Sequence, residues 1–202
     1  MKLINALMGC LLVGVLAVGC ATQASVRVSN ELTSPFLTDA DHQKADDEAL
    51  QERIQRLLKV QLAKNSKTIN VLVDNSNVLL SGQVASLSLK NQAESLCANL
   101  HAVNKVFNYL TVNAKPVLNT NSSISSDAKT RLDSQNNIDG QAIKIVTVDN
   151  IVYLMGTNIG DLSALNLAIN GIYSIDGVKS VTNLIQKGAY DYYGEPPVQN
   201  DD

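Results

Sequence analysis

The sequence predicts an α+β fold made of two small tandem modules, each ordered helix, strand, strand, helix, strand. Three observations support this prediction. Residues 69–82 (INVLVDNSNVLLSG) recur as residues 143–156 (IKIVTVDNIVYLMG) without a gap. Both stretches alternate apolar and polar residues around a short polar turn, a pattern typical of two paired strands. After a one-residue insertion the match continues, with residues 103–108 falling on residues 178–183, which indicates a duplicated unit.

Composition limits the function classes. The 202 residues are 45% apolar and 17% charged, which is an ordinary globular composition. A net charge of −3 argues against a nucleic-acid binder, which normally carries a basic face. Two small domains with a leader and a tail fit this length better than one large core.

The first 19 residues are predicted to be a lipoprotein signal peptide. A short basic start precedes an apolar run that is too short to span a bilayer comfortably. The run ends in LAVGC, which resembles a bacterial lipobox with Ala17 where Leu is usual, so Cys20 is predicted to be acylated, for example with palmitate. The alternative is a secretory signal without lipid, which would leave a soluble periplasmic protein. Ala21, rather than Asp, resembles the outer-membrane sorting signal of Gram-negative lipoproteins.

Residues 20–45 are rich in Ser, Thr and Asn and are predicted to be a flexible tether. The acidic, Pro-bearing residues 188–202 are predicted to be a disordered tail. With Cys10 removed and Cys20 acylated, Cys97 is the one free thiol expected in the mature chain. It shares helical spacing with apolar neighbours and lacks an electropositive setting, so it is predicted to be a buried core residue and not a catalytic thiolate.

The first domain is predicted to span residues 46–114. Its first helix carries an apolar stripe that begins at Leu50, and the acidic residues 46–48 are expected in its first turn, where they suit the helix dipole. The strand pair follows, then a helix over 88–101 and a closing strand over 106–112. Both helices must cover one face of a three-stranded sheet, because so small a sheet cannot bury itself.

A polar linker is predicted over residues 115–126 and a second domain over 127–187. Its first helix, residues 127–135, has a poorer apolar stripe of Ala128, Leu132 and Ile138. A second helix over 161–175 and a strand over 180–186 complete the repeat. Gly171 inside that helix costs about 1 kcal/mol relative to Ala, which predicts a close approach by another segment.

Each copy contains a strand ending in V-x-L-x-G, then a helix, then a G-V-x-x-V-x-N turn and strand. This arrangement resembles the BON domain, a three-stranded mixed sheet covered by two helices. Gly82, Gly156 and Gly177 are the structural glycines of the pattern, and Ala102 stands where the family commonly has Gly. The other residues that carry the resemblance are Val78, Leu80, Val103, Val106, Asn108, Val152, Leu154, Val178, Val181 and Asn183.

Two such domains behind a lipobox resemble the outer-membrane lipoproteins of the DolP type. The resemblance implies a non-enzymatic protein, anchored to the outer membrane and facing the periplasm, that maintains envelope integrity by binding anionic phospholipid through its second domain. In that group the first helix of the second domain contacts lipid, and the matching residues are Ala128, Lys129, Arg131 and Leu132, without the family's aromatic residue. The alternative is a protein-interaction or chaperone-like module that supports the outer-membrane assembly machinery or stress tolerance.

The sequence offers no pattern typical of catalysis. The two histidines, His42 and His101, have no metal-like spacing with cysteines or carboxylates. There is no G-x-S-x-G motif, no Gly-rich phosphate loop and no convincing acid/base pair. We therefore expect no metal, no cofactor, no enzymatic activity and no nucleic-acid partner.

Overall fold

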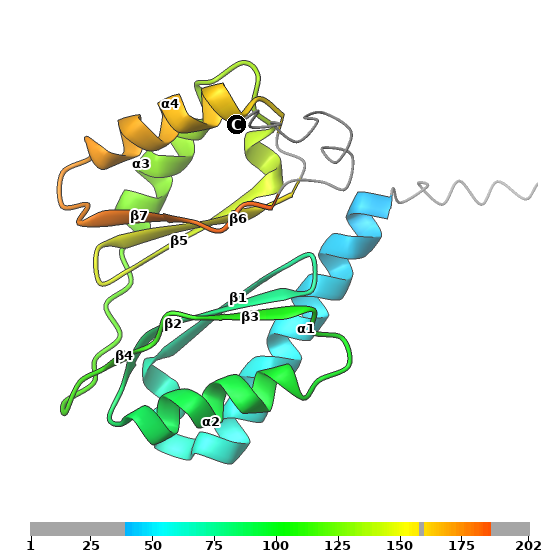
Figure 1. The fold of residues 1–202 in the computed structure, drawn as a ribbon, viewed down its shortest axis with the longest axis vertical. Helices are drawn as coiled ribbons and strands as arrows, with labels where there is room; N and C mark the ends of the chain where they lie inside the picture. The colour runs from blue at the N-terminus through cyan, green and yellow to red at the C-terminus, as the bar shows by residue number, and fades with distance from the viewer. Residues whose placement is uncertain (1–38, 158–159, 187–202) are drawn as a thin grey trace, which may run out of the picture. The chain divides into compact units, whose positions relative to one another are not determined.

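The computed structural model describes residues 39–157 and 160–186, which belong to one compact unit beginning at Leu37 (Figure 1). The predicted signal peptide, Cys20, most of the tether and the acidic tail lie outside the described residues. In the described part of the chain, no helix combines the length and apolar character needed to cross a membrane.

The first domain follows the predicted order of elements. The sheet order is β1-β2-β3, with β1 antiparallel and β3 parallel to β2, so the sheet is mixed. A short β4 pairs with the end of β2, because the predicted closing strand is interrupted at Tyr109 and Leu110. The elements are α1 (Asp39–Leu62), η1 (Ala63–Thr68), β1 (Ile69–Asp74), β2 (Asn77–Val84), α2 (Leu87–Ala98), β3 (Lys105–Asn108) and β4 (Thr111–Val112).

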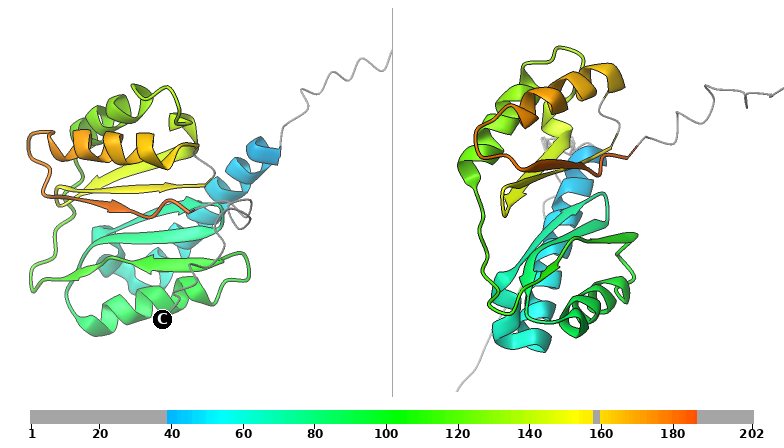
Figure 2. Two further views of the ribbon diagram at one scale, coloured as in Figure 1. Left: turned by 45° about the horizontal axis from the view of Figure 1, so that its top comes forward. Right: turned by 60° about the vertical axis from the view of Figure 1, so that its left-hand side comes forward.

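The second domain repeats this topology with sheet order β5-β6-β7, again antiparallel and then parallel. Helices α3 and α4 cover one face of its sheet (Figure 2). The predicted α+β tandem repeat is therefore confirmed. The elements are α3 (Ser122–Asp133), η2 (Gly140–Ala142), β5 (Ile143–Val148), β6 (Ile151–Gly156), α4 (Leu162–Tyr173) and β7 (Ser180–Asn183).

Both hairpins turn through two residues with positive φ. These are Asn75 and Ser76 in the first domain, and Asp149 and Asn150 in the second. Two successive left-handed residues define a type I′ turn, whose twist matches that of the paired strands and which favours Asn and Asp. The polar turn in each copy of the repeat therefore fixes the register of its hairpin.

Gly82 is required by both its conformation and its surroundings. Its φ is +112°, and a Cβ at this position would lie 2.2 Å from the carbonyl oxygen of Thr68. Gly156 occupies the same register in the second domain, opposite Ile143, as Gly82 does opposite Ile69. Gly177 has a φ of +85° in the turn after α4. The positive φ values explain why glycine occupies positions 82 and 177.

Helix α3 begins earlier than the sequence analysis predicts. Its N-cap is Asn121, whose side chain accepts the backbone N–H of Ile124, so residues 122–126 are helical and not linker. Ile124 is buried in the second core, where it corresponds to Leu50 of the first domain. The Ser/Asn-rich composition was read as linker, but the same residues are favoured at helix N-caps. Helix α1 likewise begins at Asp39, inside the predicted tether.

A third apolar core joins the two domains. The face of each sheet that is not covered by helices contributes buried residues, so β2 and β6 are buried on both faces. This explains why β6 (IVYLMG) reads as a continuous apolar run, and why β2 contains the run Val78–Leu80 and not a strict alternation. The buried members are Leu79, Val148, Tyr153 and Met155, and Leu72, Phe107, Leu118, Val146, Ile151 and Leu184 pack against them.

Candidate functional site

Two of the predicted lipid-contact residues lie in the core. Ala128 and Leu132 are fully buried in the second domain, on the side of α3 that packs against its sheet and α4. A helix places residues four apart on one face, so the stripe that the sequence shows is the inward stripe of α3. These two side chains offer no surface to lipid while the domain is folded.

Lys129 is engaged within its own domain. Its ammonium group lies 2.9 Å from Asp133 Oδ1, one helical turn away, and also donates a hydrogen bond to the carbonyl of Gly140. Lys129 thus ties the end of α3 to the start of η2. Asp133 partly neutralises the charge of Lys129, which reduces the attraction of this lysine to an anionic surface.

Arg131 is exposed and lies beside α4. A Cβ built on Gly171 would lie 3.6 Å from Arg131 Cδ, so the arginine stem passes over the glycine. At this distance a methyl group would make ordinary van der Waals contact, so the close approach predicted at Gly171 is not present. Arg131 also borders a groove at the junction of α3 with the end of α4, and that groove includes the acidic residues Asp127 and Asp176.

Helix α4 exposes one apolar side chain next to this cation. Leu167 is 62% exposed and stands one turn before Gly171, on the same side of the helix. Leu162 and Tyr173 are also exposed, but they lie roughly 120–140° around α4 from Leu167, and Tyr173 Oη donates a hydrogen bond to the carbonyl of Val181. We call Arg131 and Leu167 the α3–α4 face. The sequence predicts this helix but not its exposed leucine, although Leu167 falls outside the inward positions Leu165, Ala168 and Ile172.

A second cluster connects the two domains through charge. Lys144 Nζ, from β5, lies 3.2 Å from Asp47 Oδ2 on α1 and 3.5 Å from Asp74 Oδ1 on β1. It also donates a hydrogen bond of 2.7 Å to the carbonyl oxygen of Val73. The Asp47 side chain is only 3% exposed and that of Lys144 is 27% exposed. Buried carboxylates need such partners, because leaving water is costly for a charge.

Asp47 also holds the first hairpin. Its carboxylate accepts the backbone N–H groups of Asn75 at 2.7 Å and Ser76 at 2.9 Å. Successive N–H groups in a left-handed turn form a natural anion cradle. Because α1 starts at Asp39, Asp47 lies well inside the helix, and the expectation that residues 46–48 serve its first turn is wrong. Burial raises the pKa of Asp74, while the nearby Lys144 opposes that effect.

Aromatic and amide contacts complete the junction between the domains. The rings of Tyr109 and Tyr153 meet edge to face, with centroids 5.5 Å apart. Burial, with smaller effects from Asp149 and Tyr109, raises the pKa of Tyr153 to about 12. The Gln83 amide donates a 3.0 Å hydrogen bond to Asp149, the first turn residue of the second hairpin. Apolar packing, an ion cluster and polar contacts thus all hold the two sheets together.

The described residues hold neither a metal-binding cluster nor a reactive thiol. Among residues 39–157 and 160–186, no group of three His, Cys, Asp or Glu side chains could hold a metal ion. Cys97 is buried, and burial raises the pKa of its thiol to about 12, so the thiolate is not populated near neutral pH.

Comparison with known proteins agrees with the repeat. A family model described as the BON domain matches residues 46–114 and again residues 120–188. The Outer membrane lipoprotein DolP of Haemophilus influenzae is 28% identical over 145 residues, which cover 70% of this chain and 74% of the relative. The 21 kDa hemolysin of Actinobacillus pleuropneumoniae is 29% identical over 117 residues, covering 56% of this chain and 60% of that one.

Among solved structures, the C-terminal domain of CdsD, a structural protein of the type III secretion system of Chlamydia trachomatis, aligns at 15% identity. The alignment covers 69% of this chain and 65% of that one, with a TM-score of 0.28. A second CdsD structure gives the same TM-score at 14% identity. Similarity this low carries no argument about function.

Proposed function

We propose a function for this chain, which belongs to the BON-domain family and carries the domain twice. It is a non-enzymatic lipoprotein that helps maintain the outer membrane. The observation that carries the proposal is the similarity to an outer membrane lipoprotein over 70% of the chain. The lipobox-like sequence ending at Cys20 supports an acyl anchor. The anchor would hold both domains on the periplasmic side of the outer membrane.

The anchor dominates the energetics of membrane residence. Each methylene of an acyl chain contributes about 0.8 kcal/mol when buried in lipid, and stable anchoring takes more than one chain. A cation close to an anionic surface contributes only about 1 kcal/mol. The protein part therefore does not decide whether the molecule stays at the membrane. It can decide how the domains lie on the membrane and which lipids they contact.

Within the second domain, the α3–α4 face is the surface best suited to phospholipid. Arg131 supplies a cation, and Leu167 supplies an apolar side chain that is 62% exposed. Fully burying a leucine side chain is worth about 1.5–3 kcal/mol, so one exposed leucine can outweigh a single arginine. The proposed contact thus shifts from the buried Ala128 and Leu132 to α4, with Arg131 retained and Lys129 contributing less.

Anionic vesicles provide the test. The full chain carrying Cys20→Ser, isotopically labelled, is titrated with phosphatidylglycerol vesicles and with phosphatidylcholine vesicles at low salt. Phosphatidylglycerol should shift or broaden amide signals along the α3–α4 face, and phosphatidylcholine should do so less. Leu167→Ser should weaken the response.

The matched control is Leu87→Ser on α2 of the first domain, because Leu87 and Leu167 are each 62% exposed. This control should leave the lipid response unchanged. If neither vesicle type perturbs the second domain, the lipid contact is rejected. The protein-interaction function would then be tested by crosslinking in intact cells, with the outer-membrane assembly machinery as the expected partner.

A further inference from the structure

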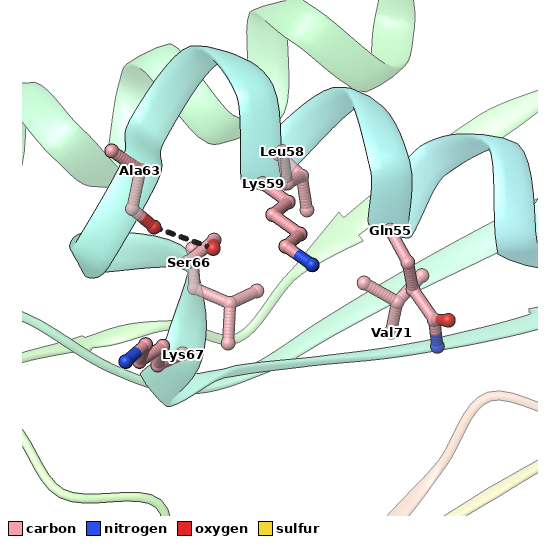
Figure 3. A pocket seen from close by; sticks show the side chains of 8 residues that line it. Gln55, Leu58, Lys59, Ala63, Ser66, Lys67 and Val71 are labelled. Atoms are coloured by element: carbon pink, nitrogen blue, oxygen red, sulfur yellow. Dashed lines mark hydrogen bonds between the residues drawn. The ribbon is translucent and has the colours of Figure 1, made fainter.

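The first domain contains a cavity of about 520 Å³ between the C-terminal half of α1, η1 and β1 (Figure 3). Its floor consists of apolar atoms of Leu58, Ile69 and Val71, which are otherwise buried in the first core. Lys59 reaches from α1 into the space between helix and strand, and Lys67 borders the cavity from η1. The volume falls within the range of about 300–1,000 Å³ that small-ligand sites occupy.

The local sequence builds this cavity at the end of α1. Ala63 adopts a left-handed φ of +48°, which ends the helix and turns the chain. Ser66 Oγ donates a 2.7 Å hydrogen bond to the carbonyl of Ala63 and holds the η1 turn (Figure 3). Strand β1 starts directly after η1, so the helix end and the strand start are kept apart, and Leu58, Ile69 and Val71 border the space between them.

The charge pattern around the cavity is one-sided. Lys59 and Lys67 are exposed, and neither forms an ion pair with any residue in the described part of the chain. None of the described residues that line the cavity carries a carboxylate. An apolar floor with two cations at its rim is complementary to a molecule that has a hydrocarbon chain and an acidic head.

Strand β1 is an edge strand, so an added peptide strand also has to be considered. The outward N–H of Val73 already donates to Gln51 Oε1 at 3.0 Å, and its outward carbonyl accepts Lys144 Nζ at 2.7 Å. At the other end, the N–H of Ile69 donates to the carbonyl of Ser66. Adding a strand requires a row of free backbone groups, and this edge is already occupied at both ends.

We propose that this cavity binds a single-chain anionic amphiphile. The hydrocarbon chain lies on Leu58, Ile69 and Val71, and the carboxylate or phosphate head lies beside Lys59 and Lys67. The site belongs to the first domain, so it does not depend on the α3–α4 face or on its contact with phospholipid.

The test uses the full chain carrying Cys20→Ser, so that no acyl chain of its own competes. Hexadecanoate, a single-chain lysophosphatidylglycerol and the neutral hexadecanol are titrated below their micelle concentrations while amide signals are followed. Both acids should shift signals around Ala63, Ile69 and Val71, and the alcohol should bind far more weakly. A preference for one acid distinguishes a free fatty acid from a lysophospholipid, and either supports the site.

Two variants with matched controls locate the site. Replacing both cations, Lys59→Gln with Lys67→Gln, should weaken binding about 25-fold, because each cation near an anionic head contributes roughly fivefold. Lys64→Gln is the control, since Lys64 is exposed on the same η1 segment but does not line the cavity. Gln55→Trp should fill the cavity and abolish binding, and Gln61→Trp, on the exposed part of α1 outside the cavity, should not.

Equal binding of hexadecanol and hexadecanoate would overturn the proposal, as would binding that survives Gln55→Trp. Signals that respond to an acidic hexapeptide but not to hexadecanoate would assign the cavity to a peptide instead.

Discussion

Lys144 Nζ lies 3.2 Å from Asp47 Oδ2, although 97 residues separate them and each belongs to a different domain. Asp47 is almost completely buried and also accepts two backbone N–H groups of the first hairpin. The same lysine reaches Asp74 and the carbonyl of Val73. One side chain of the second domain thus partners α1 and the end of β1 of the first.

Lys144→Met should lower the free energy of unfolding by about 2–3 kcal/mol. Removing one partner of a fully buried ion pair costs about 3–5 kcal/mol, and partial exposure of Lys144 reduces the effect. Urea unfolding followed by circular dichroism measures the change. The intact protein should unfold in one transition, and the variant should separate into two as the junction weakens. Lys64→Met, at an exposed position, should behave as the parent, and an unchanged midpoint for Lys144→Met would contradict a structural role.

The pKa of Asp74 should rise further in Lys144→Met. Burial already raises the pKa of Asp74 above the usual value for an aspartate, and Lys144 is the main opposing influence. Because the folded pKa exceeds the unfolded one, the folded state holds this proton more tightly, and stability falls as pH rises from the unfolded pKa through the folded pKa. Carboxyl NMR titration measures the shift in both proteins. Asp74→Asn should remove this component of the pH dependence, and a pKa for Asp74 that is lower in Lys144→Met would refute the assignment.

Gly82→Ala should destabilise the protein by about 3 kcal/mol or more, because it combines a strained backbone conformation with a clash against Thr68. The added Cβ would lie 2.2 Å from a backbone oxygen that cannot move independently of η1. Gly171→Ala is the matched control. There the nearest atom would be 3.6 Å away, so the helix should tolerate or gain from the alanine. Thermal unfolding of both variants is the measurement, and equal effects would refute the steric argument.

Cys97 should resist alkylation in the folded protein. Its thiol is buried, which keeps the reagent out and raises the pKa of the thiol to about 12. The reactive thiolate is therefore not populated near neutral pH. Mass spectrometry after iodoacetamide treatment should find Cys97 unmodified in buffer and modified in concentrated urea. Rapid modification in buffer would show that α2 opens readily.

The local elements were predictable because their signals are local. The repeat located both hairpins, and the V-x-L-x-G pattern located Gly82 at the position where only glycine fits. The start of α3 was missed because its Ser/Asn-rich first turn was read as linker. The repeat nevertheless indicates the earlier start, since a shift of 74 positions places Ile124 on Leu50, the first residue of the apolar stripe of α1.

Contacts between the domains were not predictable in the same way. Asp47 was expected at a helix start, because an acidic residue before an apolar stripe is a common helix-start signal. Its real partners lie in a turn and on another domain, which no periodicity reveals. The continuous apolar run of β6 is the available sign that its second face is also covered. Nothing in the sequence indicates that Lys144 pairs with acids of the other domain, since a lysine in a half-buried strand normally faces water.

The Lys144 cluster also bears on the history of the two halves. At the positions equivalent by the repeat, Asp47 is replaced by Asn121 and Lys144 by Asn70. Two copies of the first half would therefore place Asp47 and Asp74 together without a lysine to neutralise them. Two copies of the second half would supply neither of these acids. The two copies of the repeat have therefore diverged into complementary domains. The first supplies the acids and the second supplies the base, so neither domain can replace the other at this junction.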